Sequence, residues 1–206
     1  MNNKTWIRLL PLTILASSAA FAQNVSYLNA GTVEVGAFGG LTAGLGRTAA
    51  GAGGNIAVAA NRWVLPYFEY TYFPDLLNRT AQEEIPAQGT ARTIQVRRKN
   101  SFSDFHGGVH LRVPFKRNPS IMPYFAFGVG GLRKSNGEVQ FADGPTLEDP
   151  ARTDLAVNFG GGLRWYVRQN VGIRIEAKGY KPNSDVPAFN DAFMKVTFGV
   201  FYIWGR

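Results

Sequence analysis

Charged side chains alternate with apolar ones in several segments of this sequence. The densest group lies in one short stretch, where Asp104, His106, His110 and Arg112 all occupy even-numbered positions. Carboxylate, imidazole and guanidinium groups can form ion pairs, bind metals or transfer protons, so these four residues are the first candidates for chemistry. What they can do together depends on whether the segment is a helix or a strand.

A metal site would need His106 and His110 to lie on one turn of a helix, where residues four apart meet. In a strand, at about 3.3 Å per residue, they would be about 13 Å apart and could not share one ion. The alternation predicts a strand, so we expect no metal site. We also expect no cofactor, because the glycine clusters at 51–54 and 128–131 complete no phosphate-binding or dinucleotide-binding pattern. The chain has no cysteine, which excludes thiol chemistry.

A lipid-modifying enzyme would need a nucleophile, a histidine and an acid within hydrogen-bonding reach of one another. The nearest serines, Ser101 and Ser103, share the odd-numbered face of the segment with Phe105. Asp104 and His106 fall on the opposite face of the same strand. We therefore expect the protein not to be an enzyme, and a lipid A hydrolase or acyltransferase remains an alternative.

Period-two alternation, the pattern of strands with two different faces, recurs along the chain. From Val171 to Lys178 the odd-numbered residues are apolar, and the even-numbered ones after Gly172 are charged. Between this segment and the preceding one lies only a three-residue turn, 168–170, which predicts a hairpin. Eight strands are predicted in all, at Gly31–Gly40, Gly51–Asn61, Trp63–Phe73, Ser101–Val113, Ile121–Arg133, Asp154–Val167, Val171–Lys178 and Phe193–Trp204.

The predicted connections are short and long in turn. Residues 61–62, 114–120 and 168–170 are short connections, whereas 74–100, 134–150 and 181–192 are long ones. In an up-and-down outer-membrane barrel the short turns face the periplasm and the long loops face outwards. We therefore predict an all-β fold, a closed antiparallel up-and-down transmembrane β-barrel of about eight strands.

The alternative architecture is a soluble eight-stranded barrel with its apolar residues inside. An eight-stranded barrel has an interior only just wide enough for side chains. The large apolar side chains of one face, such as Phe105, Val109 and Leu111, would overfill it, so we expect them to face lipid. Aromatic residues near strand ends resemble the girdles at the two membrane interfaces; they are Trp63, Tyr70, Tyr72, Trp165, Tyr202 and Trp204.

The polar faces of the strands then point into the lumen. Unpaired charges are costly in a confined interior, so we expect a network of paired charges that plugs the barrel. The alternative is a narrow, gated ion path lined by the same residues. The predicted lumen residues are Glu34, Glu69, Asp104, His106, His110, Arg112, Arg164, Arg174, Glu176, Lys178 and Lys195, with Asp154 as a further candidate.

The first 22 residues have the pattern of a secretory signal peptide. Lys4 and Arg8 precede an apolar run that ends in Ala20-Phe21-Ala22, so cleavage is expected before Gln23. Residues 23–206 then form one outer-membrane β-barrel domain. Without Lys4 and Arg8, 20 basic residues stand against 14 acidic ones, a net charge of about +6 at pH 7. The cations are dispersed, so we expect no nucleic-acid partner and instead contact with lipopolysaccharide phosphates.

Three segments carry a resemblance to a known family. The stretches 159–177 and 124–133 resemble strands of the OmpA/OmpX-like small outer-membrane β-barrel family. The end of the chain is similar to the assembly signal of such barrels, except that Gly205-Arg206 follows where family members commonly stop at an aromatic residue. The residues that fill the signal are Thr197, Gly199, Tyr202 and Trp204.

The resemblance implies a monomer in the bacterial outer membrane, inserted by the outer-membrane barrel assembly machinery and surrounded by outer-membrane lipid and lipopolysaccharide. It implies a non-catalytic structural, adhesive or recognition role, with any extracellular ligand bound by the outer loops. Because the predicted last strand reaches Trp204, we expect no peptidoglycan-binding domain. The alternative, which belongs to a different class of function, is a small gated pore.

Overall fold

The structure is a computed structural model. It describes residues 29–44, 48–74, 79–87, 90–99, 101–115, 118–141, 146–183 and 191–205. The predicted signal peptide and its cleavage site lie outside the described residues.

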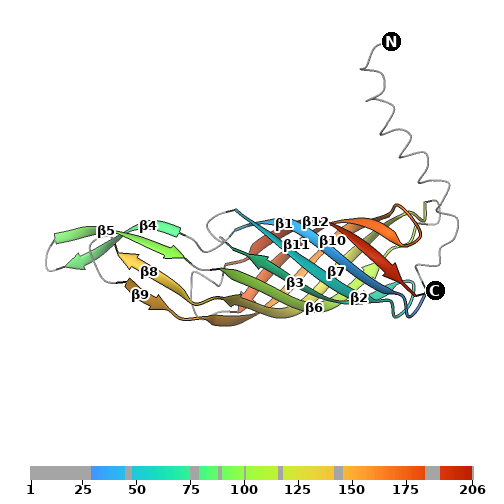
Figure 1. The fold of residues 1–206 in the computed structure, drawn as a ribbon, viewed down its shortest axis with the longest axis horizontal. Helices are drawn as coiled ribbons and strands as arrows, with labels where there is room; N and C mark the ends of the chain where they lie inside the picture. The colour runs from blue at the N-terminus through green and yellow to red at the C-terminus, as the bar shows by residue number, and fades with distance from the viewer. Residues whose placement is uncertain are drawn as a thin grey trace, which may run out of the picture.

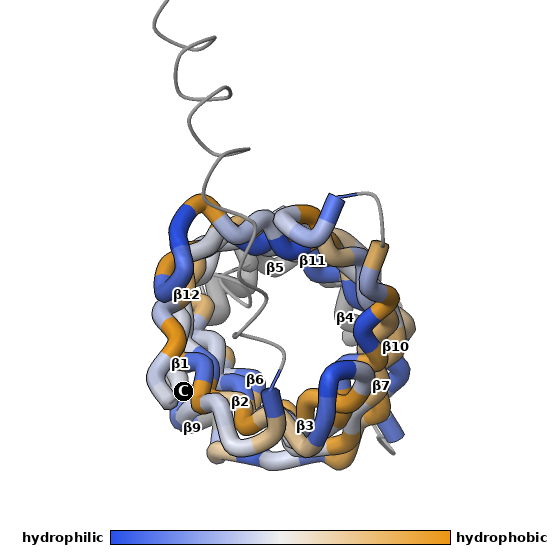
Figure 2. Tube along the Cα trace, turned by 90° about the vertical axis from the view of Figure 1, so that its right-hand side faces the viewer, coloured by the Kyte–Doolittle hydropathy of each residue, from blue (hydrophilic) through white to orange (hydrophobic). Residues whose placement is uncertain are grey.

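Eight strands close into one antiparallel barrel (Figures 1 and 2). Around the wall their order is β1-β12-β11-β10-β7-β6-β3-β2, and β2 returns to β1. The predicted all-β barrel of about eight strands is confirmed. The strands are β1 (Val33–Ala43), β2 (Ala49–Val58), β3 (Val64–Phe73), β6 (Phe102–Arg112), β7 (Ile121–Lys134), β10 (Arg152–Tyr166), β11 (Val171–Asn183) and β12 (Phe193–Trp204).

The apolar faces of these strands lie on the outside of the barrel. In β12 buried and exposed residues alternate without interruption from Phe193 to Trp204. Large apolar side chains are more than half exposed on other strands of the wall, including Phe125 of β7 at 59% and Phe159 of β10 at 64%. Exposure of so large an apolar surface to water is unfavourable, whereas the hydrocarbon core of a membrane is itself apolar. The alternative of a soluble barrel with an apolar interior is therefore wrong.

Aromatic side chains mark both rims of the apolar band. Trp63, Tyr202 and Trp204 are exposed at the rim that carries the short turns. Tyr70 and Tyr72 are exposed near the other end of β3. Since the short turns of such barrels face the periplasm, we name the first end the periplasmic rim and the second the outer rim.

The periplasmic turns are held by local hydrogen bonds. The side-chain oxygen Oδ1 of Asn61 accepts from the backbone N–H groups of Trp63 (2.8 Å) and Val64 (2.9 Å), which fixes the β2–β3 turn. The backbone N–H groups of Val167 and Arg168 both donate to the carbonyl oxygen of Val171 and close the β10–β11 turn. Among the described residues, no helix is long and apolar enough to span a membrane.

A second sheet extends beyond the outer rim (Figure 1, left). Its four strands are ordered β4-β5-β8-β9. Each strand of this sheet is next in the chain to one barrel strand: β4 to β3, β5 to β6, β8 to β7 and β9 to β10. The four barrel strands are adjacent and have the same lateral order, so one side of the barrel wall continues outwards. The strands are β4 (Arg79–Ala87), β5 (Thr90–Lys99), β8 (Gly137–Phe141) and β9 (Thr146–Asp149).

This sheet corrects the interpretation of residues 74–100 and 134–150 as loops. Both segments are rich in charged and polar residues, and neither has the one-sided apolar pattern of the barrel strands. Strand pairing here comes from hairpin closure and from the β5–β8 ladder, which joins the two hairpins from Val96–Phe141 to Lys99–Glu138. A strand that covers no core has little hydrophobic signature to detect.

Glycines on the inner face make room for large lumen side chains. A Cβ atom at Gly108 would collide with the carbonyl oxygen of Phe127 and with the ring of Tyr67. A Cβ atom at the adjacent Gly107, on the outer face, would meet only the carbonyl oxygen of Tyr67, at 3.8 Å. Inward glycine is thus a packing requirement of the narrow barrel.

We predict that Gly108→Ala destabilises the barrel by about 1–3 kcal/mol, because it overpacks the lumen against Tyr67. The urea midpoint of unfolding in phospholipid vesicles measures the effect. Gly107→Ala, one residue along the same strand, is the matched control and should leave the midpoint unchanged. Equal effects of the two substitutions would contradict the packing argument.

Candidate functional site

The lumen gathers the charged residues named from the sequence. Eleven of them lie in its buried interior, and each of these is at most 4% exposed. They come from six strands, β1, β3, β6, β10, β11 and β12. The eleven residues are Glu34, Glu69, Asp104, His106, His110, Arg112, Arg164, Arg174, Glu176, Lys178 and Lys195.

Asp154 lies elsewhere. Its carboxylate accepts a hydrogen bond of 2.7 Å from Nε of Arg152 near the outer rim, where the Arg152 side chain is 38% exposed. Asp154 is therefore part of the mouth of the barrel and not of the charged interior.

The periplasmic half of the lumen is centred on Arg164. Its guanidinium donates to both carboxylate oxygens of Glu34, at 3.2 Å each, and to Nδ1 of His110 at 2.9 Å. Since a guanidinium only donates, Nδ1 of His110 is the unprotonated ring nitrogen. The other nitrogen, Nε2, lies 3.2 Å from Glu176. Arg164 thus connects Glu34 to the centre of the barrel.

The centre of the lumen is a ladder of carboxylates and ammonium groups. Lys178 Nζ lies 2.8 Å from Glu176 and 3.2 Å from Glu69. Lys195 Nζ lies 2.9 Å from Glu69 and 2.5 Å from Asp104. The Arg174 guanidinium adds a bond of 3.4 Å to Glu69.

The ladder ends towards the outer rim at Asp104. One oxygen of its carboxylate binds Lys195, and the other binds Nδ1 of His106. The chain of contacts is therefore continuous from Glu34 at the start of β1 to His106 in β6. A single network joins distant strands across the lumen and fixes their relative positions.

The network is electrically balanced. It contains four carboxylates, those of Glu34, Glu69, Asp104 and Glu176, and four cations, those of Arg164, Arg174, Lys178 and Lys195. Arg112 is separate, since Nη2 of its guanidinium donates to the backbone carbonyl of Asn61 (2.5 Å). Buried ions are tolerated when every charge has a close partner, and the eight ions satisfy that requirement.

Tyrosines complete the lumen, and sequence reasoning missed them. Tyr124 donates a hydrogen bond of 2.7 Å from its hydroxyl to Glu176. Tyr67 stacks on His110 with ring centroids 4.0 Å apart and lies 4.6 Å from Lys178 Nζ. Tyr180 lies 5.1 Å from Lys195 Nζ. Strand alternation could have found two of them, because Tyr67 has the parity of Glu69 and Tyr180 that of Lys178.

Apolar layers close both ends of the charged interior. The layer below the outer rim contains Phe73, Phe102, Leu132, Tyr180 and Phe193, together with two alanines. The layer at the periplasmic rim consists of Met122, Tyr166, Phe201 and Ile203. The charged network is thus enclosed between two apolar layers.

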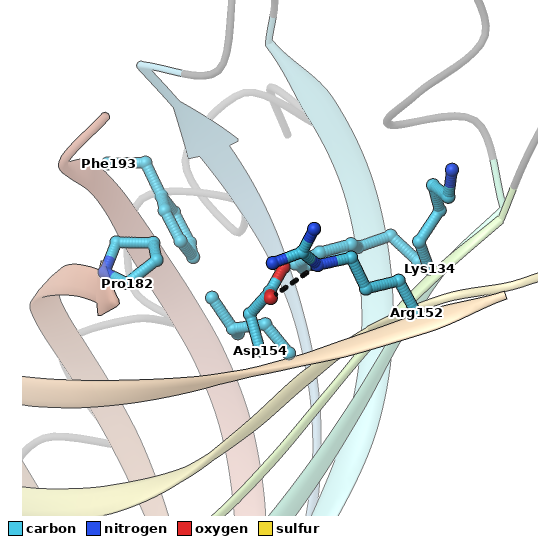
Figure 3. Close-up of a pocket in the computed structure, with 7 residues that line it drawn as sticks. Lys134, Arg152, Asp154, Pro182 and Phe193 are labelled. Carbon is cyan, nitrogen blue, oxygen red and sulfur yellow. Dashed lines mark hydrogen bonds and ion pairs between the residues drawn. The ribbon is translucent and has the colours of Figure 1, made fainter. Parts of the chain in front are cut away.

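A small cleft lies above the outer layer (Figure 3). Phe193 and Pro182 line one side of it, and the Arg152–Asp154 ion pair and Lys134 line the other. Its volume of about 10 Å³ has room for roughly one water molecule. The outer mouth therefore offers no space for a larger ligand between these side chains.

The histidines and serines are separated as the alternation predicts. His106 contacts Asp104 inside the barrel, whereas Ser103 shares a hydrogen bond of 3.1 Å with the hydroxyl of Tyr70 on the outer face. In the part of the chain that the structure describes, no three His, Cys, Asp or Glu residues are arranged to hold a metal ion.

The predicted assembly signal lies on β12. Thr197 and Gly199 face inwards and are buried, while Tyr202 and Trp204 face outwards. Trp204 pairs with Val33, so the strand that carries the signal is also the strand that closes the barrel against β1. Recognition by the assembly machinery stays a prediction.

Similar folds occur among solved structures, although no family model and no curated protein matches the chain. A major outer membrane protein of Thermus thermophilus aligns with a TM-score of 0.56 and 10% identity over 85% of this chain and 100% of that one. The N-terminal barrel of Pseudomonas aeruginosa OprF aligns with 0.51 and 16% over 85% and 98%. Ail of Yersinia pestis aligns with 0.51 and 12% over 85% and 99%.

These likenesses define the fold as that of the small outer-membrane β-barrels. A closed antiparallel barrel with an apolar outside, aromatic rims and a polar inside is the form in which strands cross the bacterial outer membrane. The chain accordingly has the fold and the apolar outer surface of an outer-membrane β-barrel, with its charged network at the depth of the apolar band.

We predict that Glu69→Gln lowers the free energy of unfolding by about 3–5 kcal/mol, because it leaves Arg174, Lys178 and Lys195 short of a buried counter-charge. Urea titration in phospholipid vesicles measures the change. The control is Glu148→Gln, which alters an exposed carboxylate of the outer sheet. A loss no larger than that of the control would mean that the network does not stabilise the barrel.

Proposed function

We propose that the protein is a non-catalytic, non-conducting outer-membrane anchor that presents a recognition or adhesive surface outside the cell. The observation that carries the proposal is the outer sheet, in which β4, β5, β8 and β9 continue four adjacent strands of the barrel wall. Binding residues commonly lie on peripheral segments held by a rigid scaffold.

The junction between barrel and outer sheet supports a defined position for that surface. The backbone N–H of Ser101 donates to Oγ of Ser135 at 3.0 Å, and the N–H of Ser135 donates back to the Ser101 carbonyl at 3.0 Å. The backbone N–H of Ala151 donates to Oδ1 of Asn136 at 2.6 Å. Hydrogen bonds therefore continue across the boundary between the two sheets.

The outer sheet also has two edges. Each of β4 and β9 pairs with one strand among those that the structure describes. An unpaired edge offers backbone N–H and C=O groups to an extended peptide of a partner. Four of the five cations of the sheet lie in one inner strand, β5, at Arg92, Arg97, Arg98 and Lys99; the fifth is Arg79 in β4.

A polyanionic glycan is the first ligand class to test. Four cations in a ten-residue strand suit sulfate or carboxylate groups of such a chain. Ail, which shares the fold, has been crystallised with the heparin analogue sucrose octasulfate. Heparin is therefore a suitable probe.

The interior supports the absence of conduction. Ion flow would require Lys178 and Lys195 to leave the carboxylates between which they lie, and would require both apolar layers to open. The separation of Ser103, on the outer face, from His106, inside the barrel, supports the absence of catalysis.

We predict that the full chain reconstituted in planar bilayers gives no steady ion current. Ion flow would have to break the buried ion pairs of Lys178 and Lys195, so records at symmetric salt should match protein-free membranes. Stable, voltage-independent unitary currents would favour the alternative of a small pore.

We predict that proteoliposomes carrying the full chain are retained on immobilised heparin. A variant with Arg97→Glu and Arg98→Glu in β5 should lose most of this retention. The matched control is the double variant Arg62→Glu and Arg168→Glu at the periplasmic rim, which makes the same charge change on two exposed arginines far from the sheet. Heat-modifiable gel migration verifies that each variant is folded. Equal retention of both variants would contradict recognition by the outer sheet.

A further inference from the structure

A second feature of the outer rim lies on the membrane side of the barrel wall. It is an open cleft of about 350 Å³ between the outer ends of β3, β6 and β7. The residues that line it include Tyr70, Ser103, Phe105, Arg133, Ser135 and Asn136. We call it the rim cleft.

The rim cleft lies where the apolar band ends. Strand register places Phe105 beside Tyr70 and Gly131, and places Ser103 beside Arg133. Further down the same outer face of β7, Phe127 and Val129 are half exposed to the membrane. A lipid whose acyl chains cover these two residues would therefore bring its headgroup into the cleft.

The floor of the cleft is aromatic. The ring of Phe105 lies against Gly131 so closely that a Cβ atom at Gly131 would collide with it. Glycine at this position lets the ring lie along the wall. The cleft thus combines an apolar floor with a polar edge, as a site for an amphipathic headgroup requires.

The polar edge carries one exposed cation without a counter-charge. Arg133 is exposed and forms no ion pair with any residue that the structure describes. The residues lining the cleft include no Asp or Glu. A guanidinium at the membrane interface with no protein partner is suited to bind a phosphate group, often through two parallel hydrogen bonds.

Hydroxyl and amide groups line the cleft together with Arg133. The hydroxyls of Tyr70 and Ser103 share a hydrogen bond of 3.1 Å and can each make another. Asn136 accepts from Ala151 through Oδ1, which leaves its amide nitrogen to donate. This set of groups suits the hydroxyls of a sugar ring better than a simple glycerol headgroup.

We infer that the rim cleft binds the phosphorylated sugar headgroup of an outer-leaflet glycolipid. Arg133 binds the phosphate, Tyr70, Ser103 and Asn136 hydrogen-bond the sugar, and the acyl chains cover Phe127 and Val129. The outer position of the cleft selects the outer leaflet as the source of the lipid. This inference is independent of the proposed recognition by the outer sheet.

Native mass spectrometry of the full mature chain in detergent tests the inference, with diphosphorylated lipid A as the probe. The fraction of protein carrying the lipid is measured against lipid concentration. The wild type should bind one lipid A, and Arg133→Gln should raise the concentration for half occupancy by about tenfold, through loss of a charge-assisted bond. Arg133→Lys, which keeps the charge, should raise it less.

The matched control is Arg62→Gln, an exposed arginine at the opposite rim, which should bind as the wild type does. Equal binding of Arg133→Gln and Arg62→Gln would overturn the site. Equal binding of dephosphorylated lipid A would overturn the phosphate contact. Displacement by phosphatidylglycerol at the same concentration would overturn the preference for a sugar headgroup, and displacement by millimolar inorganic phosphate would overturn a lipid ligand altogether.

Discussion

The bilayer requires that charges inside this narrow barrel neutralise one another. The outer surface is apolar, so ionic side chains on the strands have no route to water except through the lumen. Four carboxylates and four cations meet there in one network of equal and opposite charge, and Arg112 lies apart from it on a backbone carbonyl. Other features of the wall follow from this arrangement. Inward glycines such as Gly108 provide space, and tyrosines such as Tyr124 satisfy carboxylate oxygens that the cations leave.

Much of this could be predicted from the sequence, because a transmembrane strand must keep one face apolar. The predicted strand Phe193–Trp204 has the bounds of β12, and alternation alone identifies the charged residues that lie buried together. The tyrosines were harder, since an aromatic ring suits both a lipid interface and a packed lumen. The prediction ends β11 too early, at Lys178, because the residues after Tyr180 lose the apolar alternation although they still pair with β10.

The outer sheet could not be predicted from the alternation of apolar and polar residues. Strands beyond the membrane cover no core, and their pairing partners lie in two hairpins far apart in sequence. Nothing in one hairpin alone indicates the other. The ion pairs and apolar layers of the lumen direct interest to the outside of the protein. There, the outer sheet and the rim cleft offer chemically distinct surfaces, one beyond the membrane and one at its edge.

The central claim is that buried ion pairing holds the barrel together, and a double-mutant cycle on Glu34 and Arg164 tests it most directly. Free energies of unfolding are measured by urea titration in phospholipid vesicles for the wild type, Glu34→Gln, Arg164→Met and the double variant. The account predicts a coupling energy of about 2–3 kcal/mol, whereas an exposed ion pair is expected to give roughly 0–1 kcal/mol. A coupling energy near zero would contradict the claim and would leave the lumen charges as mere fillers of space.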